Sequence, residues 1–98
     1  MMRFDLSCRY DARQNFYGKA QVEQTNDYLK LYSYGTLVAE ITKEKDGFTF
    51  HYYGRFSQTT TRHQKEFFRQ ARLTEEQIKE LFDNGKMFIP FENISSIF

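Results

Sequence analysis

One cysteine and two histidines are the residues of this 98-residue chain best suited to chemistry. Cys8 with His51 or His63 would form a thiol–imidazole pair, in which the imidazole accepts the thiol proton and leaves a nucleophilic thiolate. The same residues, at spacings of 43 and 12, match no zinc-binding signature. Cys8 lies among alternating apolar residues, which predicts a buried, unreactive thiol. We therefore expect no enzyme activity, no metal site and no cofactor.

Four carboxylates after Leu73 form a second candidate set, since they could hold a divalent cation or serve as acid–base groups. Glu75 and Glu76 would lie in the first turn of a helix, where negative charge is favourable. Glu80 and Asp83 have the spacing of a solvated helix face. This acidic face could also mimic nucleic-acid phosphates when it docks on a basic protein. Its residues in that alternative role are Glu76, Glu80 and Asp83.

Residues 54–73 carry five cations against one carboxylate, a local surplus of four positive charges in a chain of net charge +1. At 100° per residue the four cations after Arg55 fall on one arc of a helix, opposite Phe67, Phe68 and Ala71. Because Glu66 is the only acid and Gln70 is neutral, we expect the cations to lack compensation. They then predict binding to a phosphate backbone or an acidic protein surface. The residues concerned are Arg55, Arg62, Lys65, Arg69 and Arg72.

Tyrosines make up a third candidate set. Tyr28, Tyr32 and Tyr34 alternate along one strand and share a face with Lys30. An outer row of this kind can be simply a well-paired sheet face. Aromatic rings interleaved with cations also stack bases or anchor protein interfaces. Both interpretations stay open, and the second adds these four residues to the partner-binding set.

The elements that must position these residues begin with strands. Apolar and polar residues alternate over about 2–10, 16–23, 28–34, 37–41 and 48–53, with turn residues between them. In the first strand the pattern predicts a buried face made of Met2, Phe4, Leu6, Cys8 and Tyr10. Short turns join the strands, and the strongest hairpin signal is Lys45-Asp46-Gly47. The pattern predicts an antiparallel meander of about five strands.

Helical periodicity then replaces the alternation. We predict one helix over about 60–72 and a second that starts after Thr74 and ends near Asn84, with Gly85 as its C′ residue. Thr74 and Gln77 fit a capping box, and Leu73 with Ile78 fits a hydrophobic staple. The apolar tail after Gly85 contains a proline and is expected to be extended and packed on the domain or on another chain.

Size and composition fit a single α+β domain of residues 1–98, with the two helices packed on one face of the sheet. The chain is 40% hydrophobic and 28% charged, which is typical of a globular domain. A lone cysteine, the absence of a signal-peptide pattern and the absence of a long apolar run favour a cytoplasmic protein with no membrane partner.

Several short sequences carry a family resemblance. They are YD at 10–11, FYGKA at 16–20, LYSYGTLVA at 31–39 and TTxRHxKEFxxQ ending at Gln70. Together they resemble small accessory proteins of bacterial phages and plasmids, and some proteins of this size and setting are anti-CRISPR inhibitors. The resemblance implies a non-catalytic protein that binds the type II CRISPR effector nuclease or its guide RNA. Such binding would block assembly or target DNA loading, without a small-molecule substrate. The alternative is a nucleic-acid-binding regulator from a phage or plasmid.

Overall fold

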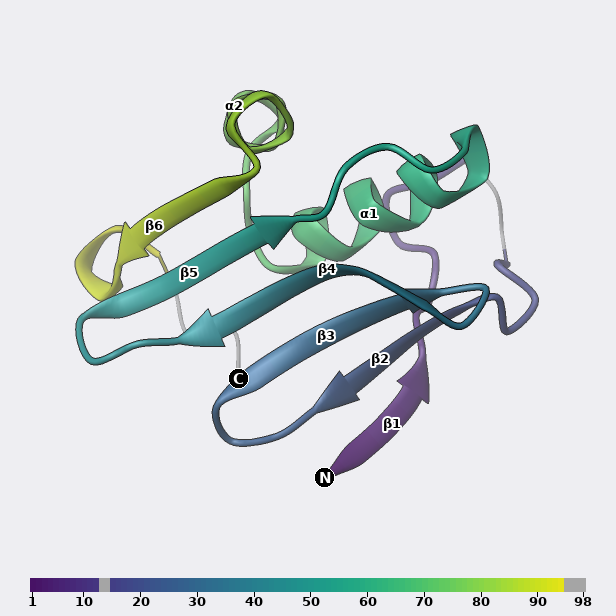
Figure 1. Cartoon of the computed structure of the whole chain (residues 1–98), viewed down its shortest axis with the longest axis horizontal. Coiled ribbons are helices and arrows are strands. Elements are labelled where there is room, and N and C mark those ends of the chain that lie inside the picture. The colour runs from purple at the N-terminus through teal and green to yellow at the C-terminus, as the bar shows by residue number, and fades with distance from the viewer. Residues whose placement is uncertain (13–14, 95–98) are drawn as a thin grey trace.

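A six-stranded antiparallel sheet forms one layer of the molecule, and two helices form the other (Figure 1). The computed structural model describes residues 1–12 and 15–94. The strands lie in the sheet in chain order, so each pairs with the next. They are β1 Met2–Asp5, β2 Ala20–Gln24, β3 Tyr28–Ser33, β4 Thr36–Lys43, β5 Gly47–Tyr52 and β6 Lys86–Pro90. The expected α+β class and the meander are confirmed.

Both helices lie between β5 and β6 in the chain and cover the same face of the sheet. Helix α1 (Gln58–Gln70) packs on β3 and β4, and helix α2 (Glu75–Asn84) packs on β5 and β6. Helix α1 begins earlier than expected because Ser57 caps it, with the Ser57 hydroxyl accepting the Thr60 amide at 3.1 Å. The boundaries of α2 are as predicted.

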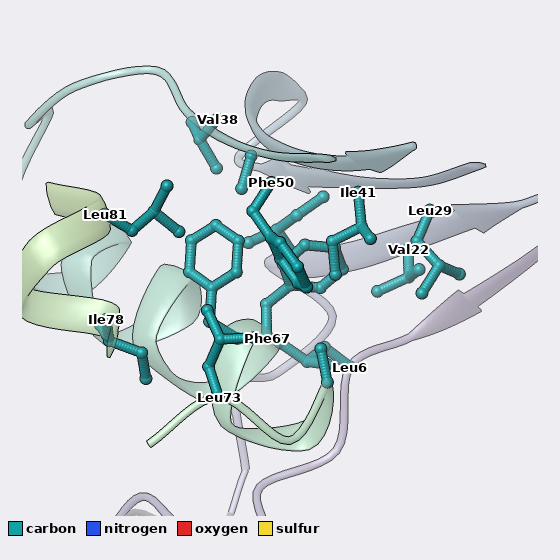
Figure 2. Packing of buried hydrophobic residues seen from close by; sticks show 14 of the residues in the cluster. Leu6, Val22, Leu29, Val38, Ile41, Phe50, Phe67, Leu73, Ile78 and Leu81 are labelled. Atoms are coloured by element: carbon teal, nitrogen blue, oxygen red, sulfur yellow. The ribbon is translucent and has the colours of Figure 1, made fainter. Parts of the chain in front are cut away.

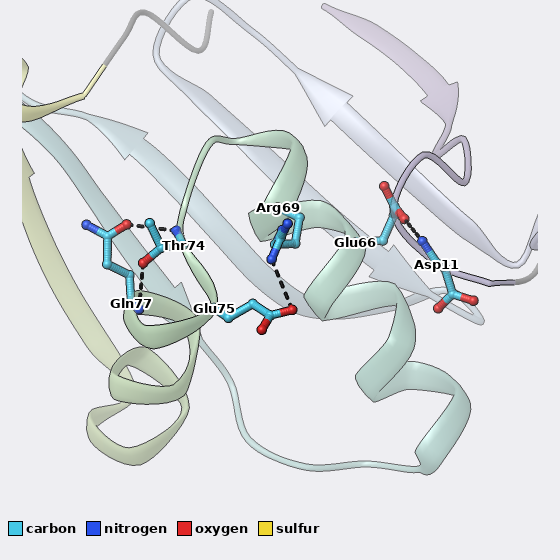
Figure 3. Close-up of polar contacts among 6 residues, drawn as sticks. All are labelled: Asp11, Glu66, Arg69, Thr74, Glu75 and Gln77. Carbon is cyan, nitrogen blue, oxygen red and sulfur yellow. Dashed lines mark hydrogen bonds and ion pairs between the residues drawn. The ribbon is translucent and has the colours of Figure 1, made fainter.

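Local signals at the ends of α2 are confirmed in detail. The Thr74 hydroxyl accepts the Gln77 amide at 3.1 Å, and the Gln77 side chain accepts the Thr74 amide at 2.9 Å, which completes the capping box (Figure 3). Gly85 adopts φ +80° and ends the helix. Only glycine takes this left-handed conformation without a steric cost.

The core lies between the sheet and the helices (Figure 2). Apolar residues from β2 to β5 face Phe67, Phe68 and Ala71 of α1, as the helical periodicity predicts. Ile78 and Leu81 of α2 are also buried, and Phe82 stacks on Tyr52 at 4.0 Å between ring centroids. The basic side of α1 therefore faces away from the sheet.

The N-terminal strand differs from its prediction. It ends at Asp5 rather than continuing to residue 10, and Met2, Phe4 and Tyr10 are exposed. The reason is position, because β1 is an edge strand and neither helix covers it. Leu6 is buried and Cys8 is partly buried against the core, in a segment that leaves the sheet before β2. Alternation alone could not reveal that the strand lies at an edge.

The C-terminal segment packs on the domain, which was one of the two expected outcomes. Residues 86–90 form β6 beside β5, and a 3₁₀ turn follows at Phe91–Asn93. The Phe91 ring meets the Phe48 ring edge to face at 5.2 Å. The predicted extended tail thus adds a sixth strand to the sheet, while residues 95–98 lie outside the described part of the chain.

Candidate functional site

The outward side of α1 carries the basic residues as predicted, but two of them are compensated. Arg62 lies 3.7 Å from an Asp11 carboxylate oxygen. Arg69 lies 3.2 Å from a Glu75 carboxylate oxygen (Figure 3). Lys65 and Arg72 are exposed. The expectation of uncompensated cations was therefore wrong, because the acids come from other segments of the chain.

Glu66, the one acid within this helix, is a buried anchor for another segment of the chain. Its side chain is only 2% exposed and accepts the backbone amides of Arg9, Tyr10 and Asp11 at 2.8–3.1 Å. Figure 3 shows the bond from Asp11. Gln70 also donates to it, at 2.6 Å. Carboxylates that accept several amides hold a chain segment firmly. Glu66 thus fixes the N-terminal loop beside α1.

An open groove of about 610 Å³ lies between α1, α2 and this loop. Its apolar lining comes from Tyr10, Ile78 and Phe82, and charged side chains of both signs surround that lining. The charged lining residues are Asp11, Lys65, Glu66, Arg69, Glu75, Lys79 and Asp83. A mixed-charge lining with an apolar part is typical of a surface that recognises protein.

A second hollow continues from this groove past the end of α1. It is shared by Tyr10, Arg69 and Glu75 and extends to Arg72, Leu73 and Thr74. The Arg69 guanidinium lies 5.0 Å from the centre of the Tyr10 ring, so the two side chains form a cation–π pair. The predicted residues Lys65, Arg69, Arg72 and Asp83 therefore come together along connected hollows.

Other predicted residues lie elsewhere on the helix side. Arg62 pairs with Asp11 but does not line the groove, and Arg55 is exposed before the start of α1, at the opposite end from Arg72. Glu76 and Glu80 are exposed on α2 and line neither hollow. The expected acidic face is thus divided, since Glu75 and Asp83 line the groove and Glu76 and Glu80 do not.

The tyrosine row lies on the outer face of the sheet, opposite the helices. Tyr28, Lys30 and Tyr32 alternate with the buried residues of β3, so they point away from the core. Lys30 lies 4.4 Å from the Tyr28 ring centre, and Arg3 lies 4.6 Å from the Tyr32 ring centre. The tyrosines with Lys30 and the cations of α1 therefore lie on opposite sides of the sheet.

Tyr34 does not continue this row. It sits in the turn between β3 and β4 with φ +52°, and the pairing of β3 with β4 shifts between Leu31 and Tyr32. Its ring lies 5.9 Å from the His63 ring, which belongs to α1. A turn conformation that few non-glycine residues adopt thus removes Tyr34 from the predicted face.

Opposite charges alternate across the outer face from β1 to β4. One cross-strand row runs from Arg3 to Lys86 through Glu23, Lys30, Glu40 and His51. The Tyr53 hydroxyl donates to Glu40 at 2.9 Å, and the His51 ring stacks on Tyr53 at 5.9 Å. Partial burial, together with the Glu40 carboxylate, raises the pKa of Tyr53 to about 12. Cross-strand pairs of opposite charge stabilise a solvated sheet face.

A buried Ser–His contact is the arrangement closest to a catalytic pair. The Ser33 hydroxyl lies 2.7 Å from His63 Nδ1 and 2.8 Å from the Thr60 hydroxyl. All three side chains are almost fully buried, and the Phe16 ring packs edge-on against His63 at 4.5 Å. A nucleophile must meet its substrate, so we interpret this cluster as a polar contact that joins α1 to β3.

Among the groove residues that sequence reasoning did not assign to a binding surface are Tyr10, Glu75 and Lys79. Glu75 and Lys79 are four residues apart, a spacing that puts both on the side of α2 facing the groove. That signal was available in the sequence. Nothing local could have placed Tyr10 beside Arg69, since they are far apart in the chain and meet only through the loop that Glu66 holds.

Neither a metal cluster nor a membrane-spanning helix occurs in the part of the chain that the structure describes. Among residues 1–12 and 15–94, no three histidine, cysteine or acidic side chains gather as a metal ion would require. Within the same residues, no helix combines the length and the apolar character needed to cross a membrane.

Comparison with known proteins places the chain by family alone. No curated protein and no solved structure matches it. A model of a family of unknown function, DUF8033, matches residues 4–84, which include every strand from β2 to β5, both helices and all the groove residues. The chain belongs to this family of unknown function.

Proposed function

We propose that this protein is a non-catalytic binding protein and that the groove between α1 and α2 receives a partner protein. The observation that carries the proposal is the groove itself, in which apolar side chains of Tyr10, Ile78 and Phe82 lie among charges of both signs. Apolar area supplies affinity, and the surrounding charges select the partner and its orientation.

The charges in the groove favour protein over a phosphate backbone. Three cations line it, Lys65, Arg69 and Lys79, and four carboxylates lie among them. A surface that follows phosphates concentrates positive charge, because its affinity comes from releasing counterions. The best occupant is therefore an amphipathic protein segment that presents apolar side chains flanked by both acids and bases.

The resemblance of several short sequences to small accessory proteins of phages and plasmids supports one candidate partner, the type II CRISPR effector nuclease. In this proposal the protein binds the effector, rather than its guide RNA, and blocks assembly or target DNA loading. An effector of this kind offers extended basic surface around its nucleic-acid channels. The exposed acids Glu76 and Glu80 beside Asp83 would extend the contact onto that surface.

A matched pair of charge-reversal variants tests the groove. The test variant is Lys65→Glu with Lys79→Glu, both exposed groove residues, and the control is Lys43→Glu with Lys45→Glu, both exposed near the β4–β5 turn. Binding is measured by interferometry to a purified type II effector, without and with guide RNA, and to guide RNA alone. We expect the test variant to bind the effector roughly tenfold more weakly, because the reversed charges would repel the acids of the bound segment that Lys65 and Lys79 face. The control, which changes the net charge by the same amount away from the groove, should keep its affinity. Equal affinities of the two variants would exclude the groove.

A nucleic-acid-binding regulator is the second candidate, and the outer face of the sheet favours it. Tyr28 and Tyr32 present rings beside Lys30 and Arg3 there, and such rings can stack unpaired bases. In the same experiment this function predicts binding to guide RNA alone, with an affinity that falls steeply as salt rises. Tyr28→Ala with Tyr32→Ala would then abolish binding, whereas the groove variant would bind normally.

A further inference from the structure

The free edge of β1 presents a regularly paired backbone. The Leu6 amide donates to the Ala20 carbonyl at 2.9 Å, and β1 pairs with β2 in the same register throughout. Hydrogen-bonded and non-hydrogen-bonded pairs alternate along an antiparallel ladder. Phe4 therefore directs its backbone groups to β2, whereas Arg3 and Asp5 direct theirs to the open side. Among the described residues, no strand lies beyond β1 to accept them.

The opposite edge of the sheet is protected in a way that β1 is not. The Tyr52 amide donates to the Gly85 carbonyl, so the same alternation makes Lys86, Phe88 and Pro90 the outward positions of β6. Proline has no amide to donate, and an edge lysine discourages a further strand. Strand β1 has neither residue.

We propose that β1 pairs antiparallel with β1 of a second copy of this chain, about a two-fold axis at Phe4. For the two backbones to pair, a residue whose backbone groups point to the open side in one chain must lie opposite such a residue in the other chain. The two-fold axis must therefore pass through Arg3, Phe4 or Asp5. An axis at Arg3 or at Asp5 sets that charge against its own copy. An axis at Phe4 sets each Arg3 opposite the other chain's Asp5, twice by symmetry.

Side chains on both faces of β1 fit this register. Gln21 holds the two charged residues in place, since Arg3 Nε donates to its side-chain oxygen at 2.9 Å and its amide donates to Asp5 at 3.3 Å. On the helix side, Phe4 is 40% exposed and Met2 is 55% exposed. The two Phe4 rings would form the central pair, with each Met2 beside Leu6 of the other chain. Side chains approach closely in such a non-hydrogen-bonded pair.

The contact is small, so the pairing gives a weak dimer whose population depends on protein concentration. A charge exchange tests it by sedimentation velocity over a concentration series. Arg3→Asp alone and Asp5→Arg alone should each weaken self-association roughly tenfold or more, because like charges then meet at both pairs. The double variant, Arg3→Asp with Asp5→Arg, should restore it. An equimolar mixture of the two single variants should associate as a heterodimer.

Amide hydrogen exchange provides an independent measurement on the wild-type chain. The amides of Arg3 and Asp5 should become protected as the concentration rises, whereas the Phe4 amide, bonded to β2, should be protected at every concentration. A chain that stays monomeric at about 1 mM, where a dimer with a Kd of about 1 mM would be populated, contradicts the proposal. The proposal is also contradicted if the single variants associate as strongly as the wild type. The same holds if the double variant folds but does not regain self-association.

Discussion

Glu66 and Glu40 lie on opposite sides of the sheet, and each accepts hydrogen bonds from more than one group. Glu66 is buried and joins α1 to three backbone amides of a loop more than fifty residues away in the chain. Glu40 is only partly buried and accepts from Tyr53 and Thr42, both close to it in the sheet. The helix side thus depends on a few buried contacts between distant segments, and the outer face depends on several exposed contacts between neighbours.

Because of this difference, the groove and the outer face of the sheet owe their shapes to different parts of the structure. The loop that Glu66 holds supplies Tyr10 and Asp11 to the groove, so the shape of the groove depends on that one carboxylate. The outer face needs no such anchor, because the sheet itself sets the spacing of its side chains. A fixed hollow suits a partner of defined shape, whereas a flat aromatic face suits a ligand recognised by stacking.

The largest expected effect lies in the core beneath the helices. Phe67→Ala should lower the free energy of unfolding by about 3–5 kcal/mol, because the ring is buried between α1 and the sheet. Phe88→Ala is the matched control, since that ring is 49% exposed on the outer face. We expect the control to cost less than about 1 kcal/mol. Urea denaturation measures both, and similar losses would contradict the assignment of inner and outer faces.

Changing the two carboxylates to amides tests how strongly each side of the sheet depends on its carboxylate. Glu66→Gln should cost about 2 kcal/mol, because an amide oxygen cannot replace the carboxylate for several buried backbone donors. Glu40→Gln should cost about 0.5 kcal/mol, since water can replace its exposed contacts. Thermal or urea unfolding gives both values. The Glu66 variant should also bind a groove partner more weakly, and an intact groove affinity would show that the loop does not shape the site.

The sequence predicts the local features of this molecule correctly but not the contacts between distant segments. The capping box at Thr74 and Gln77, the left-handed Gly85 and the alternation of β3 are local, and all were predicted correctly. Failures occurred where distant segments meet. The acids that pair with Arg62 and Arg69, and the burial of Glu66, depend on the path of a loop that has no periodic pattern.

A strained residue on the helix side offers a smaller test. Arg72 adopts φ +72° just after α1, where its amide donates to Arg69 and the Leu73 amide donates to Phe68, the arrangement of a Schellman motif. Glycine is the residue that suits this position. Arg72→Gly should therefore raise the free energy of unfolding by about 1 kcal/mol. If the second hollow contributes to binding, the same change weakens the partner's affinity, so stability and binding should move in opposite directions.

The smallest effect concerns the outer face and its dependence on pH. The pKa of Tyr53 is raised from 10.0 to about 12, chiefly by partial burial and then by the Glu40 carboxylate. A raised pKa means that the folded state favours the protonated phenol. The stability from this residue is therefore complete below pH 10 and is lost as the pH rises from 10 towards 12.

Tyr53→Phe is the variant that isolates this contribution from the other tyrosines. Below pH 10 it should be slightly less stable than the wild-type chain, because it lacks the hydrogen bond to Glu40. The difference should shrink as the pH approaches 12, since the wild type then loses the same interaction. Urea denaturation at a series of pH values measures it, with Tyr17→Phe as the control because Tyr17 is exposed. A difference that stays constant across this range would mean that Tyr53 and Glu40 do not interact on the outer face.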